Sequence, residues 1–256
     1  MMRKFAGVTA AVAALTPFIL FCDNAGARNA LPSPLVYLRD IDATITQDIR
    51  YATSNNFTGR PLPGYDAAEC VLTRDAALAL KQVQTDLAAS RLSLKVYDCY
   101  RPERAVRAMA KWAHDGRDST ATKRFFPNFD KSQLFALGYI AGYSKHSGGT
   151  AIDLTLIETN APPAAFDPAA AYGPCTGPSA SRAPDNSLDM GTGYDCLDVQ
   201  GHTTSPAITA EQRRNRTTLV AAMRKRGFSN YFREWWHFSF TGGSGAPHYD
   251  VPIRPR

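Results

Sequence analysis

The sequence lacks the short motifs that mark several large classes of enzyme. It has no G-x-S-x-G segment, so the nucleophile elbow of an α/β-hydrolase is excluded. It has neither an H-E-x-x-H motif nor a phosphate-binding glycine loop, which excludes the helical zinc motif and a P-loop nucleotide site. No internal repeat is visible in the 256 residues, so a solenoid is not expected.

Long hydrophobic runs are also scarce, and the clearest one lies at the N-terminus. The basic pair Arg3-Lys4 precedes an apolar run over residues 5–21, and Ala25-Gly26-Ala27 follows it. This order is typical of a secretory signal peptide, which we assign to residues 1–27. The run is shorter than a membrane span, so no membrane anchor is expected after cleavage. Residues 28–256 are therefore predicted to form a single periplasmic or secreted domain.

Charge of one sign is not strongly enriched. The chain has 29 Lys and Arg residues against 23 Asp and Glu residues, a formal net charge of +6. Basic residues gather only at 213–216 and 224–226, on one predicted helix, where a solvated helix face is the favoured interpretation. We therefore predict no nucleic-acid partner.

Cysteine is rare, and no C-x-x-C pair occurs, which disfavours a four-cysteine zinc site. Beyond the signal peptide the cysteines are Cys70, Cys99, Cys175 and Cys196. An even number in an exported chain indicates disulfides, and four cysteines allow three pairings. We favour Cys70–Cys99 and Cys175–Cys196, because each of these bonds closes a local loop.

Hydrophobic periodicity and turn residues predict a mixture of helices and short strands. Helices are expected over 73–90, after Pro102, and over 210–226; extended segments over 35–51, 92–97 and 232–240; loops over 55–65 and 158–187. The order shows no regular βαβ alternation, which favours an α+β fold with a central antiparallel sheet flanked by helices.

Two distant segments carry side chains that are suited to binding a metal. His146 and Asp153 are separated by Gly148 and Gly149, which disfavour a continuous helix between them. A turn would instead bring both side chains to one point, with Asp153 on a strand. Taken alone, a histidine beside glycines is explained equally well as an ordinary loop residue.

The second segment is Glu234-Trp235-Trp236-His237. Glu234 and His237 would point to opposite faces of a regular strand, so the chain must bend if both reach one site. The tryptophans are expected to pack in the core, but an unpaired charge is costly to bury among them. Two imidazoles, one carboxylate and a further glutamate provide three ligands and a base, which indicates a zinc hydrolase.

A candidate cation follows the predicted 92–97 strand. Arg101 lies in the segment Asp98-Cys99-Tyr100-Arg101-Pro102, where the end of a strand would place it near the metal. An arginine before a proline is otherwise an ordinary surface residue, and this segment alone favours that explanation.

These motifs together resemble a known family. The residues Ser144-x-His146-x(6)-Asp153, Glu234-Trp235-Trp236-His237 and Tyr100-Arg101-Pro102 look like those of the VanX-type D-alanyl-D-alanine dipeptidases. The segments 51–59 and 189–195 look like further parts of that family, so the resemblance covers nearly all of residues 28–256. It implies an α+β fold of the Hedgehog/DD-peptidase type, with zinc on an antiparallel sheet.

Position by position, the resemblance implies one Zn²⁺ per chain, held by His146, Asp153 and His237. It implies that Glu234 is the catalytic base and that Arg101 stabilises the transition state. The substrate would be D-Ala-D-Ala, which the enzyme would hydrolyse to free D-alanine.

The resemblance also implies roles around the catalytic residues. Asp98 would orient Arg101, while Tyr51, Ser144 and Asp195 would line the substrate pocket. Asp195 would lie near the ammonium group of the dipeptide.

Some residues depart from the pattern of the resistance enzymes in this family. Lys145 and Gly148 stand where Ser and Arg are expected, Cys99 replaces a small residue, and the 158–187 loop is enlarged. These changes bear on substrate range more than on chemistry. An exported enzyme would not easily deplete a cytoplasmic pool of D-Ala-D-Ala, so turnover or salvage of wall-derived dipeptides is the expected role.

Two alternatives remain open at this point. A zinc D,D-carboxypeptidase or endopeptidase acting on peptidoglycan stem peptides would share the ligands and differ in having an open groove. A zinc-containing binding module without catalysis belongs to another class, and it would need neither Glu234 nor Arg101.

Overall fold

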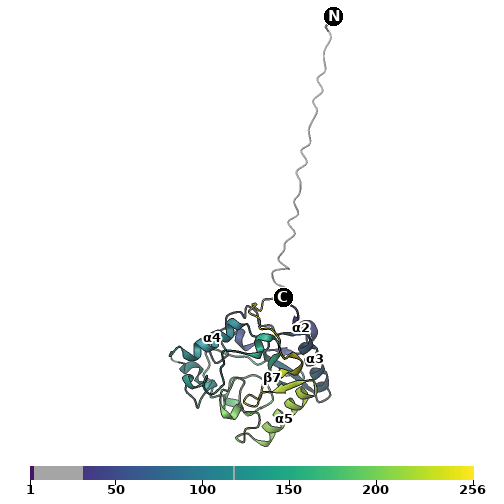
Figure 1. Cartoon of the computed structure of the whole chain (residues 1–256). Helices are drawn as coiled ribbons and strands as arrows, with labels where there is room; N and C mark the ends of the chain where they lie inside the picture. Colours follow the sequence, from purple (N-terminus) through teal and green to yellow (C-terminus); the bar gives the residue numbers. More distant parts are fainter. Residues whose placement is uncertain (3–30, 118) are drawn as a thin grey trace. The chain divides into compact units, whose positions relative to one another are not determined.

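A five-stranded sheet in the order β2-β4-β5-β7-β6 forms the centre of the fold (Figure 1). Its strands are β2 (Thr46–Gln47), β4 (Leu92–Asp98), β5 (Ala151–Glu158), β7 (His237–Phe240) and β6 (Phe228–Asn230). Neighbouring strands are antiparallel except that β2 runs parallel to β4. The predicted antiparallel sheet is therefore wrong at this edge, and the sheet is mixed. The chain between β2 and β4 is long enough for the crossover that a parallel pair requires.

The computed structural model describes residues 1–2, 31–117 and 119–256. Nearly all of the predicted signal peptide, residues 3–27, lies outside the described residues. Residues Leu31–Arg256 cluster as one unit. Within the described ranges, no helix has the length and apolar character needed to cross a membrane.

A smaller sheet and the helices surround these strands. Strand β1 (Leu35–Tyr37) pairs antiparallel with β3 (Val71–Thr73). The α-helices are α2 (Leu38–Ile41), α3 (Arg74–Ala88), α4 (Glu103–His114) and α5 (Ala210–Lys225). Helices α3 and α5 contact each other and the five-stranded sheet. The helices predicted over 73–90, after Pro102 and over 210–226 are thus confirmed, to within two residues of the stated bounds.

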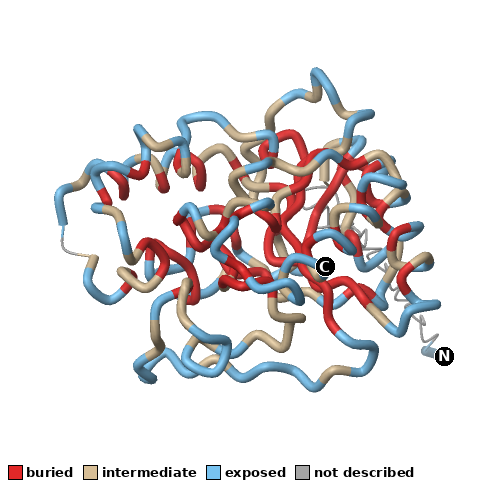
Figure 2. Tube along the Cα trace, turned by 90° about the horizontal axis from the view of Figure 1, so that it is seen from below, coloured by how far each residue is buried: buried red, intermediate tan, exposed pale blue. Residues whose placement is uncertain are grey.

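Burial follows the same arrangement (Figure 2). Buried residues run along the central strands, and helix α3 turns Ala76, Leu80, Val83 and Leu87 inward at the spacing that predicted it. Short 3₁₀ segments join the larger elements: η1 (Arg50–Ala52), η2 (Thr120–Phe125), η3 (Lys131–Gln133), η4 (Lys145–Gly148), η5 (Ser179–Ser181), η6 (Val199–Gly201) and η7 (Thr241–Gly243).

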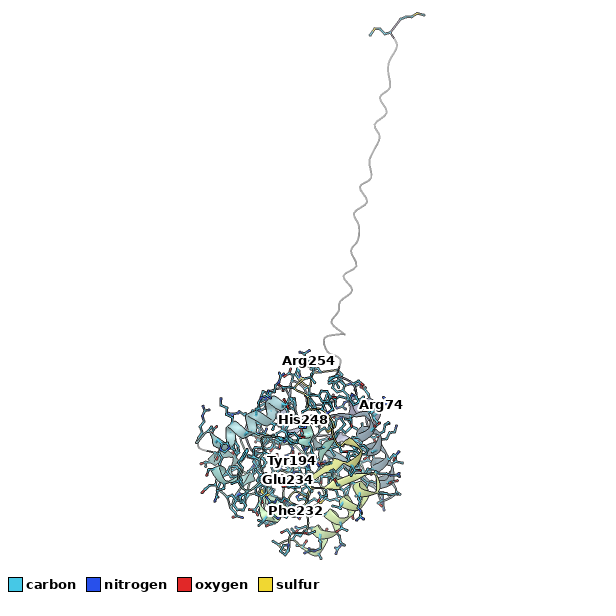
Figure 3. All side chains as sticks on the ribbon, in the orientation of Figure 1. Arg74, Tyr194, Phe232, Glu234, His248 and Arg254 are labelled. Carbon is cyan, nitrogen blue, oxygen red and sulfur yellow. A yellow bond between two sulfur atoms is a disulfide. The ribbon has the colours of Figure 1, made fainter. Side chains whose placement is uncertain are left out.

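Two predicted extended segments are only partly extended. The 35–51 segment contains α2 and the start of η1 as well as strands β1 and β2. In the 232–240 segment only His237–Phe240 is a strand, because the chain before it turns through a bond from the His237 amide to the Glu234 carbonyl, 3.3 Å long. Figure 3 labels Glu234, where this turn begins, and Phe232 in the segment before it. The turn is the bend that the spacing of Glu234 and His237 requires.

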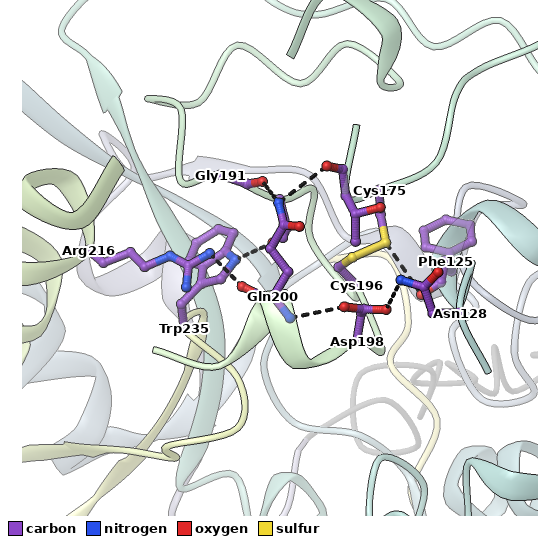
Figure 4. Close-up of a disulfide and its surroundings, with 11 residues drawn as sticks. Phe125, Asn128, Cys175, Gly191, Cys196, Asp198, Gln200, Arg216 and Trp235 are labelled. Atoms are coloured by element: carbon purple, nitrogen blue, oxygen red, sulfur yellow. Dashed lines mark hydrogen bonds between the residues drawn. A yellow bond between two sulfur atoms is a disulfide. The ribbon is translucent and has the colours of Figure 1, made fainter. Parts of the chain in front are cut away.

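Both predicted disulfides are present. Cys70–Cys99 joins the residue before β3 to the residue after β4, and Cys175–Cys196 ties down the long segment that follows β5 (Figure 4). That segment, residues 159–187, has no strand and only the short η5, as predicted for an irregular loop.

Candidate active site

Strand pairing places acidic and histidine side chains side by side in the sheet. Asp153 of β5 pairs with His237 of β7 on one side and with Asp98 of β4 on the other. The ladder is irregular between Val96 and Asp98, so the pairing shifts by one residue there. Such an irregularity re-aims side chains at the end of a strand. Two of the metal-ligand candidates, Asp153 and His237, thus lie on adjacent strands of the sheet.

His146 is brought to Asp153 and His237 by the turn that precedes β5. Its Nε2 lies 3.1 Å from Nδ1 of His237 and 3.4 Å from Oδ1 of Asp153, while Nδ1 of His237 lies 3.0 Å from the same oxygen. Three ligands of a tetrahedral zinc ion, each about 2.05 Å from the metal, are separated by about 3.3 Å. The three side chains therefore fit one such ion, as three donors with a fourth position open.

The orientation of His146 is fixed from both sides. Its Nδ1 lies 2.6 Å from the carbonyl oxygen of Cys99, to which Nδ1–H donates, so Nε2 keeps a free lone pair for a metal. Ser144 caps the η4 turn by accepting a bond from the His146 amide. Gly149 ends the turn in the left-handed region, with φ of 68°, and a Cβ there would lie 2.5 Å from Leu35. The left-handed backbone and the close contact with Leu35 therefore favour glycine at this position.

The negative charge of Asp153 and the positive charge of the histidines stabilise each other within this cluster. Burial alone would raise the pKa of Asp153, but His146 and His237 outweigh it and hold that pKa far below its usual value. Burial would lower the pKa of His237, yet Asp153 and then Glu234 raise it overall. In both residues the attraction within the cluster exceeds the cost of desolvation.

Glu234 lies in the turn before β7, with Oε2 3.8 Å from Nδ1 of His237. Its burial, aided by the charge of Asp153, raises the pKa of Glu234 to about 7, against the lowering effects of His237 and Arg101. A carboxyl group with this pKa can exchange protons near neutral pH.

Arg101 is held as a fixed cation on the same side of the sheet. Its Nε and Nη2 donate to Oδ2 of Asp98 at 2.9 and 2.8 Å, and its Nη2 lies 3.6 Å from Oδ2 of Asp153. The other oxygen of Asp98 accepts a 2.5 Å bond from the hydroxyl of Tyr65. The guanidinium also lies over the ring of Tyr51, 4.9 Å from its centre.

Tyr51 and Asp195 form a buried pair on another side of the pocket. The Tyr51 hydroxyl donates to Oδ2 of Asp195 at 2.8 Å. Burial, together with the charge of Asp153, raises the pKa of Asp195 well above its usual value. Asp195 has a positive φ of 55°, a conformation in which aspartate is more common than most residues. A cation entering the pocket would stabilise this carboxylate.

These side chains surround one pocket with a volume of about 440 Å³. Its lining includes eight residues singled out from the sequence: Tyr51, Arg101, Ser144, His146, Asp153, Asp195, Glu234 and His237. Asp98 is fully buried behind Arg101.

Two tyrosines in this network were not predicted from the sequence to belong to the site. Tyr194 donates to Oδ2 of Asp153 at 3.0 Å and stacks on Tyr97, with ring centres 4.3 Å apart. Tyr65 supports Asp98, as described above. Both lie outside helices and strands, where no periodic pattern marks the direction of a side chain. The one available signal was that Tyr194 directly precedes Asp195.

Comparison with known proteins identifies the relatives of this chain. Its residues 33–165 and 175–253 match the family model described as Peptidase M15, D-Ala-D-Ala dipeptidase. It is 32% identical over 203 residues to the D-alanyl-D-alanine dipeptidase of Enterococcus faecalis, covering 79% of this chain and 89% of that protein. It is 31% identical over 219 residues to the corresponding protein of Enterococcus faecium, covering 85% and 97%.

The similarity to solved structures is more distant. A vancomycin-resistance D,D-dipeptidase bound to a D-Ala-D-Ala phosphinate analogue aligns with a TM-score of 0.34 and 16% identity, over 82% of this chain and 67% of that one. The family model and the two enterococcal relatives confirm the family that was predicted from the sequence. The chain belongs to the D-Ala-D-Ala dipeptidase family of M15 metallopeptidases.

Proposed function

We propose that this dipeptidase works with a single zinc ion held by His146, Asp153 and His237. The observation that carries the proposal is the spacing of their three donor atoms, 3.0 to 3.4 Å, on the wall of the pocket. Two imidazoles and a carboxylate are a set of donors typical of catalytic zinc. The bond from His146 Nδ1–H to the Cys99 carbonyl is the kind of outer support that such ligands have.

Zinc at this position would lower the pKa of a bound water to about 7 and would polarise the scissile carbonyl group. Glu234 takes one proton from the attacking water, whose oxygen bonds to the carbonyl carbon of the first D-alanine. As the C–N bond breaks, Glu234 gives this proton to the leaving amino group of the second D-alanine. A pKa of about 7 for Glu234 in the metal-free protein suits a group that both accepts and returns a proton.

Arg101 stabilises the negative charge that develops on the carbonyl oxygen. The Asp98 carboxylate fixes its guanidinium through two bonds, so the cation is in place before the reaction begins. Preorganised charge of this kind contributes most when it is shielded from water, and the Arg101 side chain is only 12% exposed.

Asp195 and Tyr51 bind the free ammonium group of the substrate. Asp195 is 4% exposed, and its carboxylate is destabilised by burial, so a substrate cation would supply the charge partner that it needs. Ser144 contributes to the lining of the same pocket. An acylated amino group has no positive charge, so this pair favours a free dipeptide over a stem peptide and disfavours the carboxypeptidase alternative.

A binding module without catalysis is disfavoured by the same geometry. A structural zinc site needs neither a buried carboxyl group with a pKa of about 7 nor a fixed guanidinium beside it. We infer further that the enzyme works outside the cytoplasm on wall-derived dipeptides. The predicted signal peptide and the two disulfides support this location.

The metal part of the proposal is tested by zinc content and activity measured together. The metal-free protein should regain hydrolysis of D-Ala-D-Ala in step with added zinc, up to one ion per chain. His146→Ala should bind no zinc at that site, whereas His114→Ala, at the far end of α4, should behave as the unaltered protein does. Full activity without metal, or with two ions required per chain, would contradict the assignment.

A further inference from the structure

A second hollow with a volume of about 360 Å³ adjoins the active-site pocket. The two share four lining residues, Tyr143, Lys145, Ser229 and Ser239. None of these belongs to the pair Tyr51–Asp195, which lines the first pocket only. The pocket therefore has a buried acidic side, where the ammonium group is proposed to bind, and a different side, at Lys145, that adjoins the second hollow.

The second hollow is lined by basic and not by acidic side chains. Its lining contains two basic residues, Lys145 and His248, and no acidic residue. Figure 3 labels His248, whose ring packs on Tyr143 with centres 4.3 Å apart. The nearest acid to His248 is Glu103, whose Oε1 lies 3.8 Å from its Nδ1 and which lies outside the lining. The remaining polar side chains of the lining are serines, threonines and Tyr143, which all carry hydroxyl groups.

Lys145 combines a fixed main chain with a free side chain. Its carbonyl accepts a bond from Thr150, and its neighbours Ser144 and His146 are held by the turn that positions the metal-ligand candidate. Its side chain is exposed. Within residues 31–117 and 119–256, no carboxylate lies within 4.0 Å of its Nζ. The ammonium group is thus available to a ligand at the junction of the two hollows.

We propose that the second hollow is a subsite for the side chain of the C-terminal substrate residue, and that Lys145 makes it selective for acidic side chains. The substrate class is D,D-dipeptides of the form D-Ala-D-Glu, besides D-Ala-D-Ala. The methyl group of D-alanine leaves the second hollow empty, whereas a longer side chain reaches it. A flexible ammonium that no carboxylate of the described residues holds can pair with one on the substrate side chain, and such complementarity sets specificity.

This inference rests on the proposed function, because it assumes that the dipeptide amino group is held by Asp195. The test compares D-Ala-D-Glu with D-Ala-D-Gln, which have nearly the same size and the same main-chain carboxylate. The protein as it exists should cleave D-Ala-D-Glu with kcat/KM about fivefold higher, the factor expected of one partly exposed ion pair. The difference should appear in KM rather than kcat, and it should shrink as salt is added.

Substitutions at Lys145 assign the effect. Lys145→Met should remove the preference for D-Ala-D-Glu over D-Ala-D-Gln, while Lys145→Arg should keep it. Lys81→Met, on the exposed side of α3, is the matched control and should leave the ratio unchanged. Thermal unfolding of each variant checks that it is folded.

Each outcome decides between the alternatives. Equal kcat/KM for the two substrates, or a preference that survives in Lys145→Met, would overturn the subsite. Neither of these results affects the proposed function, which instead fails if the zinc-loaded protein cleaves no D,D-dipeptide at all, D-Ala-D-Ala included.

Discussion

The Nδ1 atom of His146 lies 2.6 Å from the carbonyl oxygen of Cys99, and Cys99 is bonded to Cys70. A disulfide is thereby linked to the support of a proposed metal ligand. The bond fixes the chain after β4, at the point where the sheet ends and the Arg101 segment begins. The short segment around Cys99 thus both cross-links the fold and helps to position the candidate site.

The first prediction concerns this disulfide. Replacing Cys70 and Cys99 by serine should lower the free energy of unfolding by about 3.5 kcal/mol, the loop-closure value for a separation of 29 residues. It should also weaken zinc binding, because the Cys99 carbonyl is less firmly held. Unfolding in urea and competition with a chelator measure the two effects.

The matched control is the second disulfide. Replacing Cys175 and Cys196 by serine should cost a similar free energy of unfolding, because this bond closes a loop of comparable length, 21 residues. Zinc affinity should be retained, since neither cysteine contacts a metal-ligand candidate. An equal loss of zinc affinity in both double variants would show that Cys99 has no special part in holding His146.

The second prediction concerns Tyr194. Removing its hydroxyl in Tyr194→Phe takes away the donor to Oδ2 of Asp153, and zinc affinity should fall by about tenfold. The ring remains, so stacking on Tyr97 and the fold should be retained. Tyr172→Phe, in the 159–187 segment, is the control. Unchanged affinity in Tyr194→Phe would leave Tyr194 with a packing role only.

The third prediction separates catalysis from metal binding. Glu234→Gln and Arg101→Met should each lower kcat for D-Ala-D-Ala by at least about 100-fold, as expected on removing a general base or an oxyanion donor. Zinc content should stay close to that of the unaltered protein in both variants. Glu234→Gln should keep its thermal stability, whereas Arg101→Met should unfold at a lower temperature, because it leaves the buried Asp98 carboxylate without its cation. Near-normal turnover by either variant, or loss of zinc from Glu234→Gln, would refute the role given to that residue.

The fourth prediction concerns stability at low pH. Burial would raise the pKa of Asp185, but Lys95 and Arg50 outweigh it and lower that pKa to about 2. A carboxyl group with a depressed pKa stabilises the fold above its unfolded value of about 3.9 and loses that contribution as the pH falls toward 2. The contribution at pH 7 is about 2.5 kcal/mol.

Asp185→Asn should therefore lower the free energy of unfolding at pH 7. The difference from the unaltered protein should become progressively smaller below pH 4. Urea unfolding of both proteins at pH 7 and at pH 3 measures this difference. Asp66→Asn, at an exposed position, provides the comparison. A deficit in Asp185→Asn that stays constant across this pH range would mean that the pKa of Asp185 is not depressed by Lys95 and Arg50.

Their unusual positions in apolar or glycine-containing segments marked His146, Asp153, Glu234 and His237 as candidates. Of the other lining residues, Tyr51, Ser144 and Asp195 were predicted only through the family resemblance. The sequence was not sufficient to show how these side chains meet. The pairing of Asp153 with His237 is a matter of strand register, which depends on tertiary packing. Strand β2 has only two residues, too few to carry a pattern, and so its parallel pairing with β4 was missed.

Loops set a further limit on prediction. The 3₁₀ turn that carries His146 follows from Gly149, whose positive φ is readable from the sequence only as a preference for a turn. The hydroxyl of Tyr194 finds Asp153 across 41 positions, and no local pattern indicates such a contact. By contrast, the cysteine pairing was predictable, because both bonds close short loops.

The most direct test of the account is the release of free D-alanine from D-Ala-D-Ala by the purified protein, measured with zinc, with a chelator, and beside N-acetyl-D-Ala-D-Ala. We expect cleavage of the free dipeptide with zinc, its loss with the chelator, and no cleavage of the acetylated peptide. Cleavage that continues in the chelator, or equal cleavage of the acetylated peptide, would contradict the zinc site or the ammonium-binding pair, respectively.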